Sequence, residues 1–305
     1  MLCQRTIERP AHAIGIGVHS GRPVRLTLRP ADANTGIDFD RLDVAASPVA
    51  ATAQNVTDTT LSTSIGDHGV QVATVEHLMS ALWGLAIDNV RVELTNEEVP
   101  IMDGSAQPFV EMIQGAGIRE LAAPRKFIKI TREVSVSQGD AHASLRPYDG
   151  FRAAYTFVAD HPVFNRYPKR ADVDFASACY VGEVCAARSF GLMRELPQAH
   201  AIRKCLGSSL QNAVGIDDHD IVNGEGLRYH DEFVKHKLLD AIGDLYLLGV
   251  PVLGAFDGYM SGHALNNKLA RAVLRCTDAW TLVSSAEEHE RADVSTLAAW
   301  ASRSV

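Results

Sequence analysis

The sequence predicts an α+β fold made of two similar units. Strand-like segments with a period of two come in runs, and helical segments with a period of 3.6 follow them. The order of strands, a histidine-bearing helix ended by glycine, a strand and a second helix occurs once in each half of the chain. Grouped strands with helices on one face favour α+β over a doubly wound sheet, and the repeated order indicates a weak internal duplication.

In the first half, residues 13–40 alternate apolar and polar side chains around the Gly-rich run IGIGVHSG, which predicts a hairpin leading into a sheet. Residues 70–76 are expected to be extended. The run TVEHLMSALWGL predicts a short amphipathic helix with Thr74 as its N-cap. NVRVEL predicts a strand, and DGSAQPFVEMIQGAG predicts a second helix that ends at glycine.

A boundary between the two units is expected near residues 121–127, within LAAPRKFIKI. After it, RKFIKITREVSVS and FRAAYTFVAD predict strands, EFVKHKLLDAIGDLYLLG a helix, VPVLGAF a strand and HALNNKLARAVLR another helix. We therefore expect a first domain over residues 1–122, a second over residues 127–280 and a C-terminal tail over residues 281–305.

Composition excludes several classes of function. A chain of 305 residues with 46% hydrophobic composition can bury a substantial core, so we expect a soluble globular protein. The net charge of −8 and the lack of a Lys/Arg block argue against nucleic-acid and anionic-membrane partners. Five cysteines without a CxxC pair indicate reduced thiols. The longest nearly apolar run, LYLLGVPVLGAF, has 12 residues and the N-terminus lacks a signal-peptide pattern, so a cytoplasmic protein without a transmembrane segment is expected.

The helix predicted over residues 232–249 carries an unusual polar row. His236, Asp240 and Asp244 stand at positions i, i+4 and i+8, which places an imidazole and two carboxylates on one side of a helix that otherwise supplies core residues. A catalytic zinc site takes three N/O ligands and leaves one position open. His236 and Asp240 have the spacing for two of these ligands, and the internal duplication nominates His77 as the third.

Three further residues could serve a hydrolytic reaction at such a site. Glu76 is a carboxylate next to a candidate ligand and could take a proton from the attacking water. His263 lies in a glycine-containing loop just before a helix, where it could protonate a leaving amine. Asp244 is surrounded by apolar neighbours in sequence and needs a cationic partner, such as an imidazolium.

Plainer interpretations of the same residues exist. An HxxxD pair on a helix is often a polar edge, Glu is favoured at helix N-termini by the dipole, and a lone histidine such as His263 can cap a helix. If the row of His236, Asp240 and Asp244 has only a structural role, His236→Ala should lower stability without changing metal content. A binding module without activity would not need a base, an acid and three ligands together.

The longer motifs resemble a known family. The runs GIGVHSG, TVEHLMSAL, PIMDGSAQPFV, ARSFG, GLRYHDEFVKHKLLDAIGDLYLLG and GHALNNKL are similar, in order and spacing, to the UDP-3-O-acyl-N-acetylglucosamine deacetylases, the zinc amidases of lipid A synthesis in Gram-negative bacteria. The resemblance covers roughly residues 3–280 and is most specific over residues 226–249. It implies two β-α-α-β domains whose helix layers lie between two sheets, with the active site at the domain interface.

The resemblance also implies roles for the polar residues. His77, His236 and Asp240 would bind Zn²⁺, although the same N/O set would accept Fe²⁺. Glu76 would be the general base, and His263, kept cationic by Asp244, the general acid. The implied reaction is hydrolysis of the 2-acetamido group of a UDP-glucosamine with a 3-O-hydroxyacyl chain, which releases acetate. A related amidase acting on another acylated sugar is the alternative, and a monomer is expected.

Substrate contacts follow by the same resemblance. Lys237 would reach the polar head of the substrate and Phe190 would stack near the sugar and diphosphate. Leu61 and Ser62 would lie beside the scissile amide. An inserted βαβ element near residues 188–216 would line a passage for the acyl chain, and its candidate wall residues are Met193, Leu196, Cys205 and Val214.

The chain departs from the family pattern at two positions. Ser189 stands in ARSFG where the family usually has threonine, and the loss of the β-branch leaves the expected oxyanion donor less preorganised. Ser208 stands in LGSS, where the family more often has a second glycine. It is expected to narrow or stiffen the passage, which leaves the preferred acyl length open.

Overall fold

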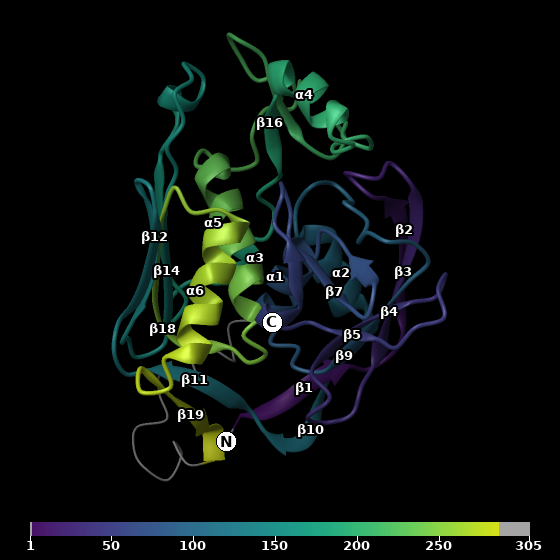
Figure 1. The fold of residues 1–305 in the computed structure, drawn as a ribbon, viewed down its shortest axis with the longest axis vertical. Coiled ribbons are helices and arrows are strands. Elements are labelled where there is room, and N and C mark those ends of the chain that lie inside the picture. Colours follow the sequence, from purple (N-terminus) through teal and green to yellow (C-terminus); the bar gives the residue numbers. More distant parts are fainter. Residues whose placement is uncertain (1, 287–305) are drawn as a thin grey trace.

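The computed structural model describes residues 2–286 and arranges them in layers. Two sheets form the outer layers and helices lie between them (Figure 1). The interior helices are α1 (Glu76–Gly84), α2 (Gln107–Ala116), α5 (Glu232–Tyr246) and α6 (His263–Arg275). Several sheets with few helices are the arrangement that the α+β prediction requires.

The first sheet is built mainly from the hairpin predicted near the N-terminus. Its strand order is β2-β3-β9-β4-β5, and β4 runs parallel to β9 while the other neighbouring pairs are antiparallel. Leu26 and Leu28 are buried, so β3 turns an apolar face toward the helices. The strands are β2 (Ala11–Ile16), β3 (Pro23–Pro30), β4 (Ile37–Arg41), β5 (Val49–Ala50) and β9 (Val90–Leu94).

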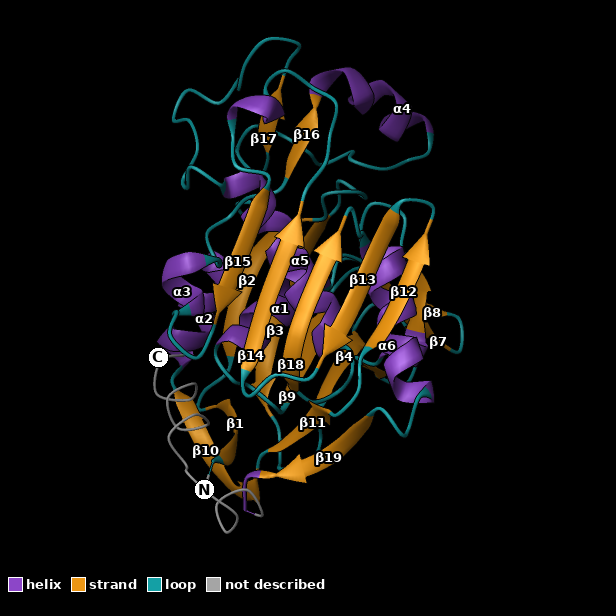
Figure 2. Ribbon diagram, turned by 90° about the vertical axis from the view of Figure 1, so that its left-hand side faces the viewer, coloured by secondary structure: helices purple, strands orange, loops and turns teal. Residues whose placement is uncertain are grey.

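The second sheet has seven strands (Figure 2). Its main path is β12-β13-β18-β11-β19, and β14 pairs with both β18 and β15. β18 runs parallel to β11 and β14, and the remaining pairs are antiparallel. The strands are β11 (Lys126–Ile130), β12 (Val134–Gln138), β13 (Ala141–Arg146), β14 (Phe151–Thr156), β15 (Arg170–Asp174), β18 (Val252–Tyr259) and β19 (Trp280–Ser284).

The strand β19 corrects the expected C-terminal tail. A C-terminal tail was expected over residues 281–305, but β19 pairs antiparallel with β11, with Lys126 opposite Ser284. The strand covers a sheet edge whose backbone groups would otherwise lack partners. The rest of the expected tail, residues 287–305, lies outside the described residues.

The helices α1 and α5 approach each other very closely. A Cβ atom added to Gly243 on α5 would lie 2.0 Å from the carbonyl oxygen of Glu76 at the start of α1. The glycine therefore allows the two backbones to touch. Because α1, α6 and β14 all pack against α5, this helix is buried on nearly every side and has no broad solvent-facing stripe.

The start of α1 differs from the prediction. Val75 occupies the N-cap position and makes no side-chain cap, while Thr74 adopts a positive φ of 60°. The Thr74 hydroxyl donates instead to Glu98 Oε1 at 2.9 Å. Glu98 is buried and needs donors, so it takes the hydroxyl that the sequence pattern assigned to capping.

A βαβ unit projects beyond the two layers, as predicted for the inserted segment (Figure 1). It consists of β16 (Phe190–Leu192), α4 (Leu196–Ala201) and β17 (Val214–Ile216), and the two strands are parallel. The remaining elements are β1 (Cys3–Ile7), β6 (Val56–Asp58), β7 (Ser64–Asp67), β8 (Val70–Val72), β10 (Ile118–Pro124), α3 (Tyr180–Glu183) and short 3-10 turns at Ala53–Asn55, Phe164–Arg166 and Met193–Glu195.

The last features of the fold are its thiols and the lengths of its helices. All five cysteines are free thiols, and burial raises the pKa of Cys185 to about 12, which keeps that thiol protonated. Within residues 2–286, no helix is both long enough and apolar enough to cross a bilayer.

Candidate metal centre

The structure brings together the three residues predicted as metal ligands. His77 comes from α1, and His236 and Asp240 come from successive turns of α5. Asp240 Oδ1 lies 3.4 Å from His77 Nε2 and 3.5 Å from His236 Nε2. One ligand atom from each side chain can be chosen so that all three lie within 4.8 Å of one another. Within residues 2–286, this is the one such group of His, Cys, Asp or Glu side chains.

The protonation of this cluster fits a divalent cation. His236 donates through Nδ1 to the carbonyl oxygen of Ala187 at 3.1 Å, and burial lowers the pKa of His236 to about 3, so its Nε2 carries a lone pair. That lone pair faces Asp240 Oδ1, which is buried and accepts no hydrogen bond. Two electron-rich atoms at this distance repel each other unless a cation lies between them. The donor set suits Zn²⁺ or Fe²⁺.

The second oxygen of Asp240 has a different partner. Lys237 Nζ donates to Asp240 Oδ2 at 2.8 Å, and the ammonium lies 5.7 Å from the centre of the Phe190 ring. Burial alone would raise the pKa of Asp240, but opposing charges, the Lys237 ammonium among them, hold it well below its usual range. Lys237 therefore keeps the carboxylate of this candidate ligand ionised, while its own charge remains near the cavity.

Glu76 and His263 face each other beside the cluster. Glu76 Oε1 lies 4.0 Å from His263 Nε2, and His263 Nδ1 lies 3.0 Å from Asp244 Oδ2. Burial raises the pKa of Glu76. Burial alone would lower the pKa of His263, but the charge and hydrogen bond of Asp244 raise it to about 9. One group is thus a buried carboxylate and the other an imidazole held in its protonated form.

Two residues of this network were missed by the sequence analysis. Thr63 donates its hydroxyl to Asp244 Oδ1 at 2.6 Å and its backbone N–H to Glu76 Oε2 at 3.0 Å. Asn266 donates to Asp244 Oδ2 at 2.9 Å. Asn266 stands at i+3 from His263, a spacing that places both on one helix face and could have indicated it. Thr63 carries no such local signal.

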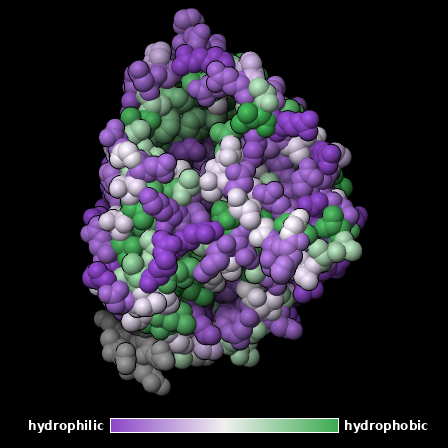
Figure 3. All heavy atoms as spheres, viewed as in Figure 1, coloured by the Kyte–Doolittle hydropathy of each residue, from purple (hydrophilic) through white to green (hydrophobic). Residues whose placement is uncertain are grey.

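A cavity of about 420 Å³ opens over the cluster. Figure 3 shows this face of the molecule hollowed near its upper end, with apolar atoms around the opening. Of the residues expected to contact substrate, Leu61, Ser189, Phe190 and Lys237 line the cavity. Ser62 does not line it and is fully buried. The chain turns at Leu61 with a φ of 63°, so that the two neighbouring side chains point to different sides.

A smaller cavity of about 170 Å³ lies in the βαβ unit. Of the predicted wall residues, Met193, Leu196 and Val214 line this cavity, whereas Cys205 lines the larger one. Both cavities share Leu196, and both also share Ser208. The apolar space inside the unit is therefore adjacent to the cavity that contains the cluster.

A buried ion pair supports the segment that leads into β16. Arg188 Nε donates to Glu232 Oε1 at 2.8 Å, and both side chains are buried. Glu232 stands one turn before His236 on α5, and Arg188 lies between Ala187 and Ser189. The pair thus fixes the carbonyl that orients His236 and the serine that lines the cavity.

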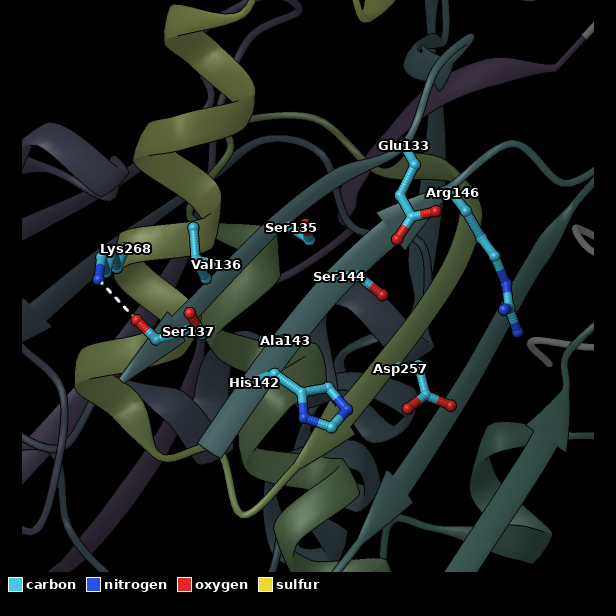
Figure 4. A pocket seen from close by; sticks show the side chains of 10 residues that line it. All are labelled: Glu133, Ser135, Val136, Ser137, His142, Ala143, Ser144, Arg146, Asp257 and Lys268. Carbon is cyan, nitrogen blue, oxygen red and sulfur yellow. Dashed lines mark hydrogen bonds between the residues drawn. The ribbon is translucent and has the colours of Figure 1, made fainter. Parts of the chain in front are cut away.

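A larger recess of about 710 Å³ lies on the outer face of the second sheet (Figure 4). The side chains drawn there spread along β12, β13 and their neighbours, and Lys268 Nζ donates to the carbonyl oxygen of Ser137 at 2.9 Å. None of the residues of the metal-ligand group lines it. Size alone therefore does not make this recess the functional site.

Comparison with known proteins identifies the family of the chain. The family model described as LpxC, UDP-3-O-acyl N-acetylglycosamine deacetylase, matches residues 4–275. A UDP-3-O-acyl-N-acetylglucosamine deacetylase of Chromohalobacter salexigens is 53% identical over 296 residues, which cover 97% of this chain and 98% of the relative. Proteins of the same name from Hahella chejuensis and Pseudomonas entomophila are each 51% identical, and each match covers 93% of this chain and 94% of the relative.

Proposed function

Because the chain belongs to the family of UDP-3-O-acyl-N-acetylglucosamine deacetylases, we propose that it removes the N-acetyl group with a divalent metal ion held by His77, His236 and Asp240. The activity itself is the deacetylation of UDP-3-O-acyl-N-acetylglucosamine in lipid A biosynthesis. The ion would be Zn²⁺ or Fe²⁺. Bound there, it would supply a Lewis acid that polarises the amide carbonyl and makes water more acidic.

One observation carries the assignment of roles. Glu76 Oε1 and His263 Nε2 lie 4.0 Å apart beside the ligand cluster, and their surroundings push their proton affinities in the directions that a base and an acid need. Glu76 takes a proton from water, whose oxygen forms the new bond to the amide carbon. His263 gives its proton to the departing nitrogen as the C–N bond breaks, leaving acetate and a free amine.

The other cavity residues bind and orient the substrate. Ser189 supplies a hydroxyl to the oxyanion, and its backbone is fixed by a hydrogen bond to the carbonyl oxygen of Gly104 at 2.7 Å. Lys237 and Phe190 contact the sugar and diphosphate, and Leu61 lies beside the amide. The apolar cavity lined by Met193, Leu196, Val214 and Ser208 receives the acyl chain.

We also infer that the chain is organised as two β-α-α-β domains that meet between α1 and α5, with a crossover near residues 122–127. The support is that each half supplies one of the two outer-layer sheets and two of the interior helices. Every residue assigned a role lies in one chain, so we expect the monomer to be active.

Acetate release by the purified protein from UDP-3-O-(3-hydroxyacyl)-N-acetylglucosamine tests the proposal. The assay compares protein as purified, after chelation, and after addition of Zn²⁺ or Fe²⁺. We expect activity to be lost on chelation and recovered with metal. Turnover that survives complete chelation overturns the metal role, and a folded, metal-loaded protein without turnover overturns the assigned substrate.

A further inference from the structure

Thr63 connects the two halves of the acid–base machinery. Its backbone N–H donates to Glu76 Oε2 at 3.0 Å, and its hydroxyl donates to Asp244 Oδ1 at 2.6 Å. Glu76 begins α1, whereas Asp244 lies near the end of α5. One residue outside both helices thus holds the carboxylate assigned as base and the carboxylate behind the assigned acid.

We propose that Thr63 is a positioning residue that fixes Glu76 and the Asp244–His263 pair relative to each other. The inference rests on the proposed function, because it assigns Thr63 a part in the same reaction. Thr63 does not line the cavity, so it acts through its two partners rather than by touching substrate.

The backbone of Thr63 is well placed for this role. Its carbonyl oxygen accepts a hydrogen bond from Val75 N–H at 3.1 Å, and Val75 is the residue before α1. Both main-chain polar groups of Thr63 therefore bind the start of that helix. The residue is 1% exposed and directly precedes β7, so its position is set by packing and by the strand.

The two hydrogen bonds select which oxygen of each carboxylate is used. With Oε2 held by Thr63, Glu76 presents Oε1 toward His263. With Oδ1 held by the Thr63 hydroxyl, Asp244 presents Oδ2 to His263. A carboxylate held at one oxygen cannot rotate freely about its terminal torsion, so the distance between base and acid is fixed before substrate arrives.

The charges around His263 make this orientation important. His263 lies 4.0 Å from Glu76 of α1 and 3.0 Å from Asp244 of α5, and it interacts electrostatically with Asp240 of α5 and His19 of the turn after β2. Several carboxylates could compete for the imidazole. A fixed Asp244 keeps the Nδ1 proton on one partner and leaves Nε2 free to face the cavity.

The test compares Thr63→Val, which keeps the shape and removes the hydroxyl, with Thr63→Ser, which restores the donor. Thr6→Val is the matched control, because Thr6 is also fully buried and its hydroxyl accepts a hydrogen bond from Ala31 N–H at 3.0 Å, far from the site. Acetate release, bound metal and the unfolding midpoint are measured for each protein. If Thr63→Val accumulates unfolded, Thr63→Ala removes the same hydroxyl without adding an apolar group.

We expect Thr63→Val to lower kcat about 10- to 100-fold, as for loss of a hydrogen bond to a charged group, with KM within about twofold of wild type. Metal content should match wild type, the unfolding midpoint should resemble that of Thr6→Val, and Thr63→Ser should recover most of kcat. An active wild type with an equally active Thr63→Val overturns the positioning role alone, and so does a loss that Thr63→Ser does not recover. An inactive wild type overturns the proposed function, and the role of Thr63 with it.

Discussion

Nδ1 of His263 lies 3.0 Å from Oδ2 of Asp244, although the two residues belong to different helices. The pair is nearly excluded from solvent, with side-chain exposures of 11% and 2%. Asp244 thereby obtains the cationic partner that its apolar neighbours demand, and His263 stays protonated in a buried site. The same contact therefore satisfies a buried carboxylate of α5 and keeps a protonated imidazole beside the cavity.

This pair predicts the pH dependence of the reaction. In the proposed mechanism His263 must be protonated to act as the acid. Its pKa is raised to about 9, so kcat/KM is expected to fall as the pH rises through that range. A bound cation adds positive charge nearby and lowers the value, which places the alkaline limb between about pH 7 and 9. Glu76 must be ionised, and its raised pKa sets an acidic limb above that of an ordinary glutamate.

The comparison of Asp244→Asn with wild type checks the origin of the alkaline limb. Removing the carboxylate charge should move this limb to lower pH by about one unit and reduce kcat at neutral pH. Asp278→Asn is the control, since Asp278 forms an exposed ion pair with Arg132 away from the cavity. If the alkaline limb of the pH profile stays at the same pH in Asp244→Asn, a group other than His263 is responsible for it.

Metal binding should be visible in stability as well as in activity. A cation that binds only the folded protein stabilises it by about 2.7 kcal/mol at one hundred times its Kd. Zn²⁺ should therefore raise the unfolding midpoint of the chelated wild type by several degrees. His236→Ala should abolish the shift and the bound metal, whereas His230→Ala, an exposed histidine just before α5, should leave both intact. Unchanged metal content in His236→Ala would favour the purely structural interpretation.

Gly243→Ala should destabilise the protein although alanine is the better helix former. In a solvent-exposed helix, replacing glycine by alanine would add about 1 kcal/mol to the stability. Here the new Cβ would lie 2.0 Å from the Glu76 carbonyl oxygen, so α1 and α5 must separate. We expect a loss of about 1–3 kcal/mol in urea unfolding and a lower kcat, because Glu76 moves. Gly115→Ala in α2 is the control, with open space at its Cβ and a neutral or stabilising effect.

Replacing only one partner of the buried Arg188–Glu232 ion pair should strongly lower the free energy of unfolding. Arg188→Met leaves Glu232, which is 0% exposed, without its cation and should lower the free energy of unfolding by about 3–5 kcal/mol. Arg166→Met, which breaks an exposed pair with Asp220, should change it by less than about 1 kcal/mol. Adding Glu232→Gln to Arg188→Met should recover part of the loss, and a further loss would contradict the desolvation argument.

Ser189 should tolerate threonine better than alanine. Removing one hydrogen-bond donor to an oxyanion lowers kcat about 10²- to 10³-fold, so Ser189→Ala is expected to lose activity in that range. Ser189→Thr keeps the donor and restricts its rotation, so its kcat should equal or exceed that of wild type. Equal kcat for wild type and Ser189→Ala would remove Ser189 from the mechanism.

The sequence was informative wherever chemistry followed a local period. The spacing of His236, Asp240 and Asp244 is enough to place them on one side of a helix, and the repeated order of elements nominates His77. These are consequences of helix geometry and of duplication. They require no knowledge of how distant segments pack.

The sequence was uninformative where a role depends on a distant partner. Thr63 and Asp244 are 181 positions apart, and nothing near Thr63 marks it as a hydrogen-bond donor to that carboxylate. Thr74 illustrates the reverse case, because its position predicts a cap but buried Glu98 takes its hydroxyl. Gly243 has the local signature of a weak helix residue, and only the contact with α1 gives its reason.

Because α1 and α5 come from different halves of the chain, cutting the chain between these halves separates the residues of the site. His77 and Glu76 come from the chain before the crossover near residue 125, whereas His236, Asp240 and His263 come from the chain after it. Neither fragment carries all three proposed ligands, or both the proposed base and the proposed acid. A chain cleaved at the crossover should therefore be inert as separate pieces and regain metal only when the pieces reassociate, which makes bound metal a direct report of correct docking between them.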